Sequence, residues 1–279
     1  MLAVLCSPRR NLSVKTRLDK LLVERGLTPS RERAQALILA GKVLVNEQKI
    51  EKAGASIDSS CTLRLLGEDL RYVSRGGLKL ERALEHWRID LKGKTCLDIG
   101  ASTGGFTDCM LQNGAARVIA VDTGNGQMDF RLRGEPRVRL LEKTNARYLR
   151  AGDLATDGPG KSTPIDFIAM DVSFISATLV LPAVIRAVSA TPVDSAIDFA
   201  ISRQIVVLVK PQFEAGRELV GKGGIVRDES TQQMAVAKVE VALIALGGTR
   251  TEWIESPILG GEGNREFLLH ADLMPGAIG

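Results

Sequence analysis

Residues 98–108, which read DIGASTGGFTD, decide the fold of this chain. They follow the apolar pair Cys96-Leu97 and precede a second apolar run, residues 119–121, which is followed by Asp122. A strand, a glycine turn, a helix and a second strand ending in a carboxylate make a nucleotide-binding half-unit. In such a unit the glycines let the backbone approach a ligand closely, and an acid such as Asp122 can accept hydrogen bonds from two ribose hydroxyls.

The glycine turn lacks the marks of a phosphate-binding loop. Its spacing is not GxGxxG, and no lysine follows Gly104-Gly105. The turn therefore suits a cofactor that carries adenosine without a pyrophosphate, which indicates S-adenosylmethionine; the alternative is a purely structural turn in an α/β domain. After the apolar run 138–141, the amide of Asn145 could read the adenine edge. The predicted cofactor-binding residues are Asp98, Gly100, Ala101, Ser102, Thr103, Gly104, Gly105, Phe106, Asp122 and Asn145.

Strands and helices alternate through the rest of the chain. Residues 165–170, which are apolar apart from Asp166, and the apolar run 206–209 have the length of buried strands, and residues 179–188 and 229–246 have helical character. This alternation predicts a doubly wound, mainly parallel sheet, that is, a Rossmann-like α/β fold.

Charged side chains recur where these strands end. Asp98, Asp122 and Asp171 each lie close to the carboxyl end of a predicted strand, which is where ligands bind in open α/β sheets. Lys210 follows the strand 206–209, and a lysine held in a cleft near other charges is a candidate base. The recurrence indicates one site at one edge of the sheet.

Composition excludes several classes of protein. The 279 residues are 44% hydrophobic and 25% charged, as in ordinary globular proteins, and no apolar run approaches the roughly 20 residues that cross a bilayer. Four cysteines without CxxC spacing favour a reducing cytoplasm and predict no metal site. The two histidines have no ligand motif around them, so we expect structural roles for both.

The net charge of +4 is concentrated at the N-terminal end. Residues 1–75 contain 14 basic and 8 acidic residues, whereas the remainder contains 23 and 25. Residues 1–14 have no periodicity and are predicted to be a disordered tail. A small α+β domain follows at residues 15–70, with two short helices and several strands, and a connector with Gly76-Gly77 as a flexible joint covers residues 71–78. Such a basic module is typical of nucleic-acid binding.

The segment TRLDKLLVERGLTPSRERAQALILAGKVLVN closely resembles the small RNA-binding domain named after ribosomal protein S-four. The resemblance implies structured RNA as a partner and says nothing about chemistry. Basic side chains on the outer face of its helices would then follow a phosphate backbone, although they could also be ordinary solvated charges. The candidate RNA-binding residues are Arg17, Arg31, Arg33 and Lys42.

Five ordered motifs carry a second resemblance: SRGGLKL, DIGASTGGFTD, MDVSFIS, LVKPQFEAG and GNREFLL. Their order resembles the TlyA family, also labelled hemolysin A, of rRNA methyltransferases with an FtsJ-like catalytic domain. The resemblance spans about residues 15–272 and implies a methyltransferase domain over residues 79–279. It also implies a catalytic tetrad of Lys79, Asp171, Lys210 and Glu266.

The implied activity is methylation of a ribose 2′-hydroxyl, with cytidine expected, in the ribosomal RNA of ribosomal subunits. The sequence Asp171-Val172-Ser173-Phe174 lacks the prolines and tyrosine of amino-directed methyltransferases, which also favours ribose. We expect a cytoplasmic monomer without metal or membrane association. Two alternatives remain: a non-catalytic RNA-binding or ribosome-assembly factor with a methyltransferase-like domain, and a membrane-active haemolysin, for which the sequence shows no amphipathic cationic helix.

Overall fold

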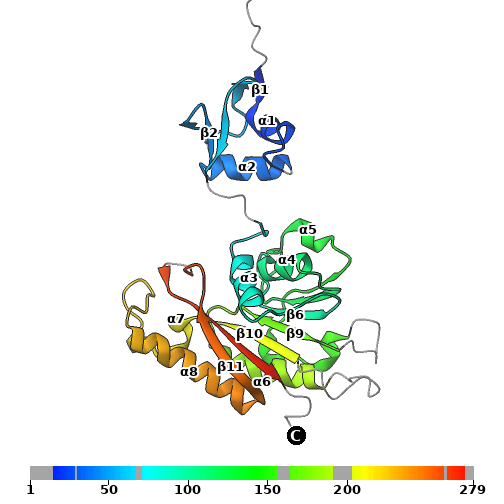
Figure 1. Ribbon diagram of the computed structural model, residues 1–279, viewed down its shortest axis with the longest axis vertical. Coiled ribbons are helices and arrows are strands. Elements are labelled where there is room, and N and C mark those ends of the chain that lie inside the picture. The colour runs from blue at the N-terminus through cyan, green and yellow to red at the C-terminus, as the bar shows by residue number, and fades with distance from the viewer. Residues whose placement is uncertain are drawn as a thin grey trace, which may run out of the picture. The chain divides into compact units, whose positions relative to one another are not determined.

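The computed structural model describes residues 15–28, 30–66, 71–155, 164–190, 203–260 and 263–273 (Figure 1). The expected tail at residues 1–14 and most of the expected connection at 191–203 lie outside these ranges. The chain divides into two compact units, Met1–Arg71 and Tyr72–Gly279, and each is described by itself.

The small unit is an α+β domain built around two helices. In α2 the Ser30 hydroxyl accepts a hydrogen bond from the Arg33 amide and so caps the helix. Thr16 lies in β1, and Arg17 occupies the position directly before α1 without a side-chain capping hydrogen bond. Two small antiparallel sheets, β1-β4 and β3-β2-β5, complete the unit. Its elements are β1 (Lys15–Arg17), α1 (Leu18–Glu24), α2 (Arg31–Leu39), β2 (Val43–Val45), β3 (Gln48–Lys49), β4 (Ser56–Asp58) and β5 (Leu63–Leu65).

The described residues of the large unit form a seven-stranded sheet in the order β11-β12-β10-β9-β6-β7-β8. The five strands from β10 to β8 in this order are parallel, and β12 runs antiparallel to both of its neighbours, β10 and β11. The predicted doubly wound, mainly parallel sheet is therefore confirmed. The strands are β6 (Thr95–Ile99), β7 (Arg117–Val121), β8 (Val138–Leu141), β9 (Phe167–Met170), β10 (Arg203–Val209), β11 (Gly248–Glu255) and β12 (Phe267–Leu273).

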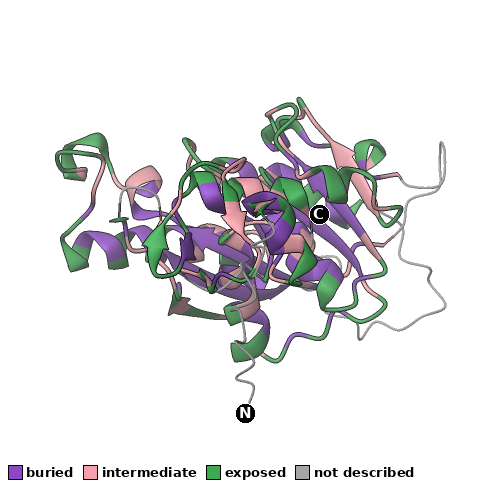
Figure 2. Ribbon diagram, turned by 90° about the horizontal axis from the view of Figure 1, so that it is seen from above, coloured by how far each residue is buried: buried purple, intermediate pink, exposed green. Residues whose placement is uncertain are grey.

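Helices cover both faces of this sheet, and its central strands are buried (purple in Figure 2). Alternate side chains of one strand enter different cores: Leu97 and Ile99 of β6 pack with α6 and α8, whereas Cys96 packs with α3 and α4. The helices are α3 (Gly76–His86), α4 (Gly105–Gln112), α5 (Phe130–Arg133), α6 (Ala177–Ser189), α7 (Pro211–Glu214) and α8 (Glu229–Ala245), with short 3₁₀ turns η1 (Ala146–Tyr148), η2 (Ala151–Leu154) and η3 (Arg217–Leu219).

The interpretation of Gly76-Gly77 as a flexible joint is wrong, because both glycines open α3. A Cβ on Gly77 would lie 2.3 Å from the ring of Tyr72, a buried side chain that occupies this space. A Cβ on Gly105, the first residue of α4, would lie 2.9 Å from the Gly77 amide nitrogen. Gly77 and Gly105 therefore allow α3 and α4 to approach closely, because a side chain at either position would clash. This close approach fixes α3 against the glycine turn.

Candidate active site

The glycine turn joins β6 to α4 at the carboxyl edge of the sheet. Gly100 and Gly104 have φ of 86° and 94°, which side chains with a Cβ rarely adopt. A Cβ on Gly100 would lie 2.3 Å from the carbonyl oxygen of Asp171, so the turn packs directly on the end of β9. Ser102 and Thr103 at its tip are exposed, and Ala101 is buried beneath them.

Asp98 lies beneath this turn, fully buried within β6. One carboxylate oxygen, Oδ2, accepts a 2.5 Å hydrogen bond from the Thr107 hydroxyl, while Oδ1 has no partner among the described residues. Burial raises the pKa of Asp98 to about 7, since a carboxylate is poorly solvated there. An unpaired buried acceptor below a ligand-binding turn fits the α-ammonium group of S-adenosylmethionine.

Three other predicted cofactor residues differ in how far they are buried. Asp122 follows β7 and accepts hydrogen bonds from the amides of Ser102 and Gly124, at 2.8 and 2.6 Å, so it links the turn to the next loop. Asn145 is exposed after β8, and its side-chain oxygen accepts from the Arg147 amide. Its NH₂ group has no acceptor among the described residues and is able to donate to an adenine ring. Phe106, in contrast, is buried in the core and supports the turn from below.

Lys210 stands at the carboxyl end of β10, as predicted. Its Nζ lies 2.5 Å from Oδ1 of Asp171, at the end of the neighbouring strand β9, and donates a 2.7 Å hydrogen bond to the Ser173 hydroxyl. The lysine side chain is only 10% exposed. Two adjacent parallel strands thus place an amine and a carboxylate in direct contact at the sheet edge.

Lys79 and Glu266 form the second lysine–carboxylate pair. Lys79 lies on α3 and its Nζ contacts Glu266 Oε2 at 2.5 Å, with both side chains buried. Glu266 precedes β12, whose antiparallel direction brings its first residue to the same edge as the ends of the parallel strands. A Cβ on Gly260 would lie 2.1 Å from the Glu266 carboxylate, so this glycine leaves room for the acid.

The two pairs meet around one cavity of about 450 Å³, which Lys210 and Glu266 both line. A smaller cavity beside it, of about 230 Å³, is lined by Lys79 and Gly260. The structure therefore brings together all four residues of the predicted tetrad, although they lie up to 187 positions apart in the sequence. Their catalytic roles stay a prediction.

Two aromatic residues line this cavity that the sequence analysis did not predict as site residues. Phe174 is 92% exposed and has φ of 64°, an uncommon and strained conformation for a bulky residue. Its ring lies 5.3 Å from that of Phe213 on α7. The motif MDVSFIS contains Phe174, but an exposed, strained aromatic cannot be told from a buried one by apolar pattern alone.

Asn264 is a further residue that the sequence reasoning did not single out. Its side chain is buried, accepts a hydrogen bond from the Val226 amide and donates to the Gly224 carbonyl. Gly224 lines the larger cavity, so Asn264 fixes the loop that borders it. The position of Asn264 beside Glu266 in the motif GNREFLL was the available signal.

In the small unit, two of the four predicted RNA-binding residues share a buried partner. Arg17 and Arg31 both contact Asp19, at 3.0 and 3.1 Å, and their hydrogen bonds hold the pKa of this acid well below its usual range. Lys42 is exposed and Arg33 is half-buried. Asp19 therefore orients two arginines at the surface, and their contact with RNA stays a prediction.

Neither a metal centre nor a spanning helix is found in the part of the chain that the structure describes. No group of three metal-ligating side chains occurs among those residues, and none of their helices has the length and hydropathy to span a bilayer. His270 instead stacks on Trp87 with ring centres 5.0 Å apart, and burial lowers its pKa.

Comparison with known proteins agrees with this geometry. The FtsJ-like methyltransferase family model matches residues 72–273, and the S4 domain model matches residues 16–60. YqxC of Bacillus subtilis, a candidate rRNA methyltransferase, is 48% identical over 92% of this chain and 86% of its own length. The 16S/23S rRNA (cytidine-2′-O)-methyltransferase TlyA of Mycobacterium tuberculosis is 40% identical over 91% and 89%. A solved structure of a candidate hemolysin from Streptococcus thermophilus is 44% identical, with a TM-score of 0.67 over 93% and 89%.

Proposed function

This chain belongs to the FtsJ-like methyltransferase family, and we propose that it methylates the ribose 2′-hydroxyl of a cytidine in ribosomal RNA. S-adenosylmethionine would supply an electrophilic methyl group at the glycine turn, next to the cavity that holds the two lysine pairs. The observation that carries this proposal is the contact of Lys210 with Asp171 in that cavity, directly beside the turn.

A ribose hydroxyl is a weak nucleophile, so the protein must orient its oxygen and help to remove one proton. The hydrogen bond that Lys210 Nζ donates to the Ser173 hydroxyl supports both roles for this residue. The ribose hydroxyl would take a comparable position. As a neutral amine Lys210 would accept the hydroxyl proton, whereas as an ammonium it would stabilise the alkoxide that forms while the proton passes to solvent. Asp171 would hold the amine in place, and the Lys79–Glu266 pair would fix the charge of the cavity wall.

The aromatic residues support a nucleotide as the substrate. Phe174 and Phe213 border the same cavity as Lys210, and an exposed ring of this kind is a stacking surface for an unpaired base. The S4 domain match supports RNA, and the activity for which the mycobacterial relative is named supports ribosomal RNA and cytidine. The proposed substrate is therefore an unstacked nucleotide within a ribosomal subunit.

The test is transfer of labelled methyl from S-adenosylmethionine to purified ribosomal subunits. We expect Lys210→Ala to lower kcat by about 10²–10⁴-fold while cofactor affinity stays within a few-fold, because a positioned base contributes that much. Lys92→Ala is the matched control, since Lys92 is an exposed lysine in the turn before β6, at the opposite edge of the sheet.

Alkaline hydrolysis of the labelled RNA identifies the atom that is methylated, because a 2′-O-methyl group blocks cleavage at its own position. Label that resists cleavage and requires Lys210 supports the proposal. Label on a base, or full activity of Lys210→Ala, contradicts it. Binding of subunits without any transfer, with cofactor affinity intact, would favour an assembly factor.

A further inference from the structure

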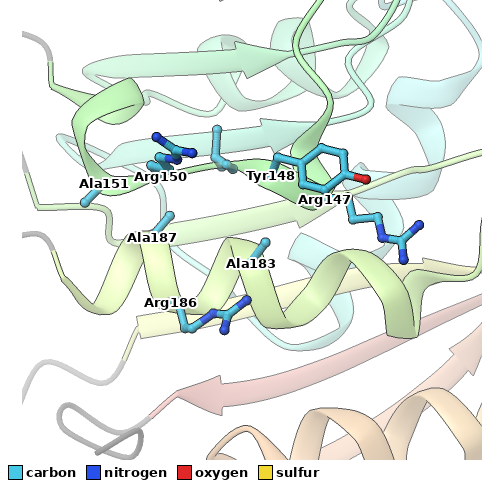
Figure 3. A pocket seen from close by; sticks show the side chains of 8 residues that line it. Arg147, Tyr148, Arg150, Ala151, Ala183, Arg186 and Ala187 are labelled. Atoms are coloured by element: carbon cyan, nitrogen blue, oxygen red, sulfur yellow. The ribbon is translucent and has the colours of Figure 1, made fainter.

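A second cavity of about 380 Å³ lies on the flank of the large unit, between η1 and η2 on one side and α6 on the other (Figure 3). Four large side chains border it: Arg147, Tyr148, Arg150 and Arg186. All four are exposed, and the alanines Ala183 and Ala187 of α6 keep its floor shallow. We call this feature the arginine groove.

The charge of the arginine groove is not neutralised by the protein in the part that the structure describes. No acidic side chain within 4.0 Å of the three guanidinium groups is found among the described residues. Asp153, the acid of this segment, instead accepts a 2.9 Å hydrogen bond from the Arg150 amide and so caps η2. Three cationic groups around one concavity repel one another, and that arrangement indicates an anionic ligand.

Two of the three arginines, Arg186 and Arg147, make contacts within the protein. Arg186 donates through Nε to the Pro182 carbonyl at 3.1 Å, which leaves its two terminal nitrogens available. The Arg147 guanidinium lies 6.0 Å from the centre of the Tyr148 ring, within the range of a cation–π contact. Tyr148 is 67% exposed, so one of its faces can stack on a base.

Two secondary-structure elements that border the groove, η1 and α6, also lead to the candidate active site. η1 begins directly after Asn145, a predicted cofactor residue. α6 begins at Ala177, whose amide donates to Glu214 of α7, the helix that follows Lys210. Arg186 lies nine residues along α6, which places it about 13 Å from that end at 1.5 Å per residue.

We propose that the arginine groove binds backbone phosphates of the substrate RNA, outside the catalytic cavity, with Tyr148 as a stacking surface for an unpaired base. This inference rests on the proposed function, which brings RNA to the neighbouring edge of the sheet. Guanidinium groups bind phosphate oxygens in a bidentate manner, and an exposed tyrosine beside them is typical of surfaces that bind single-stranded RNA. The groove would hold the strand on one side of the target nucleotide.

The test is equilibrium binding of ribosomal subunits to the full chain as a function of salt concentration. Arg150→Ala/Arg186→Ala should lower affinity roughly tenfold at moderate salt and reduce the slope of log K against log [salt] by about 1.5, because each lost phosphate contact removes about 0.7–0.9. Arg147 is left intact, since it adjoins Asn145. Lys92→Ala is the control for loss of a surface cation and should change the slope little.

A salt slope of the double variant equal to that of the Lys92→Ala control overturns the inference. A reduced slope, together with a fall in kcat/KM that follows the loss of affinity, supports it. RNA binding can be measured without turnover. The proposed methyl transfer and the proposed phosphate binding can therefore be contradicted independently of each other. If wild-type chain transfers no methyl but the slope still depends on the two arginines, the proposed reaction fails and the groove stands.

Discussion

The cavity at the candidate active site and the arginine groove both contain cationic side chains, but the surroundings of these side chains are opposite. In the cavity, Lys79 and Lys210 are buried and each contacts a carboxylate at 2.5 Å. In the groove, Arg147, Arg150 and Arg186 are exposed and show no such contact among the described residues. Burying a charge is costly and is repaid only by close geometry, whereas an exposed charge keeps its water and its freedom.

The difference in burial suits the two sites to two tasks: the buried pairs position reacting atoms, and the exposed arginines bind a flexible strand. A buried ion pair cannot adapt to a flexible ligand, but it holds its atoms at fixed places, which is what a reacting centre needs. Exposed guanidinium groups adapt to a strand and exchange their counterions for phosphates. Substitutions in the cavity should therefore change turnover and folding, whereas substitutions at exposed sites should change affinity and leave the fold intact.

The largest effect outside Lys210 is expected for the Lys79–Glu266 pair. Lys79→Met leaves the Glu266 carboxylate buried without its partner, which should lower the free energy of unfolding by about 3–5 kcal/mol. The double variant Lys79→Met/Glu266→Leu removes both charges and should recover most of that loss, while methyl transfer stays impaired. Chemical denaturation and the methyl-transfer assay measure the two properties separately.

Recovery of activity in the double variant would show that this pair is structural, and the comparison between the cavity and the groove would then rest on Lys210 alone. A single variant as stable as the wild type would show that water reaches Glu266. The exposed pair Lys20–Glu24 on α1, with Nζ and Oε1 3.3 Å apart, offers the control: Lys20→Met should cost less than about 1 kcal/mol.

The next effect concerns Asp98, a buried acid that no cationic side chain of the described residues contacts. Its pKa is raised to about 7 by burial, so the folded state holds the proton more tightly than the unfolded chain. Its contribution to stability is fully present below about pH 4 and is lost as the pH rises to about 7, by up to roughly 4 kcal/mol. Asp98→Asn, which can still accept from Thr107, should remove this dependence.

The measurement is the difference in unfolding free energy between Asp98→Asn and the wild type at several pH values, without cofactor. This difference should rise in favour of the variant between about pH 4 and pH 7 and stay level above that range. Other titrating groups are common to both proteins and cancel. A difference that is independent of pH would mean that Asp98 is solvated, and the fit of the cofactor ammonium to its free oxygen would lose its basis.

The sequence predicted the parts of this molecule that depend on local pattern. The parallel sheet, the turn between β6 and α4, and the placement of Asp171 and Lys210 at strand ends all follow from apolar runs that stop at a polar residue. The tetrad as a set came from motif resemblance, because nothing local relates Lys79 to Glu266, which lie 187 positions apart.

The sequence could not predict features that depend on what another element places nearby. The pair Gly76-Gly77 has the composition of a flexible joint. In the structure both residues are helical, because Tyr72 and Gly105 pack directly against Gly77. The arginine groove joins residues of η1 and α6, separated by a whole strand, so no window of sequence contains it. Phe174 is an apolar residue just beyond the end of a buried strand, and its exposure becomes visible only in the folded structure.

Phe174 provides the last and smallest test, because it belongs to the cavity but is exposed like the groove. Replacing it with Ala should lower kcat/KM by roughly 10- to 100-fold, mainly through KM, since base stacking contributes about 1–3 kcal/mol. Phe174→Tyr keeps a ring of the same shape and serves as the control, with activity close to that of the wild type.

Phe174→Gly separates the function of this residue from its strain. Glycine tolerates φ of 64° without the Cβ penalty, so this variant should be more stable than the wild type by about 1 kcal/mol and yet as inactive as Phe174→Ala. A gain in stability with a loss of activity means that the chain accepts a strained aromatic in order to hold RNA. If glycine instead destabilises the protein, the ring packs against Phe213 as part of the core, and Phe174 belongs with the buried residues after all.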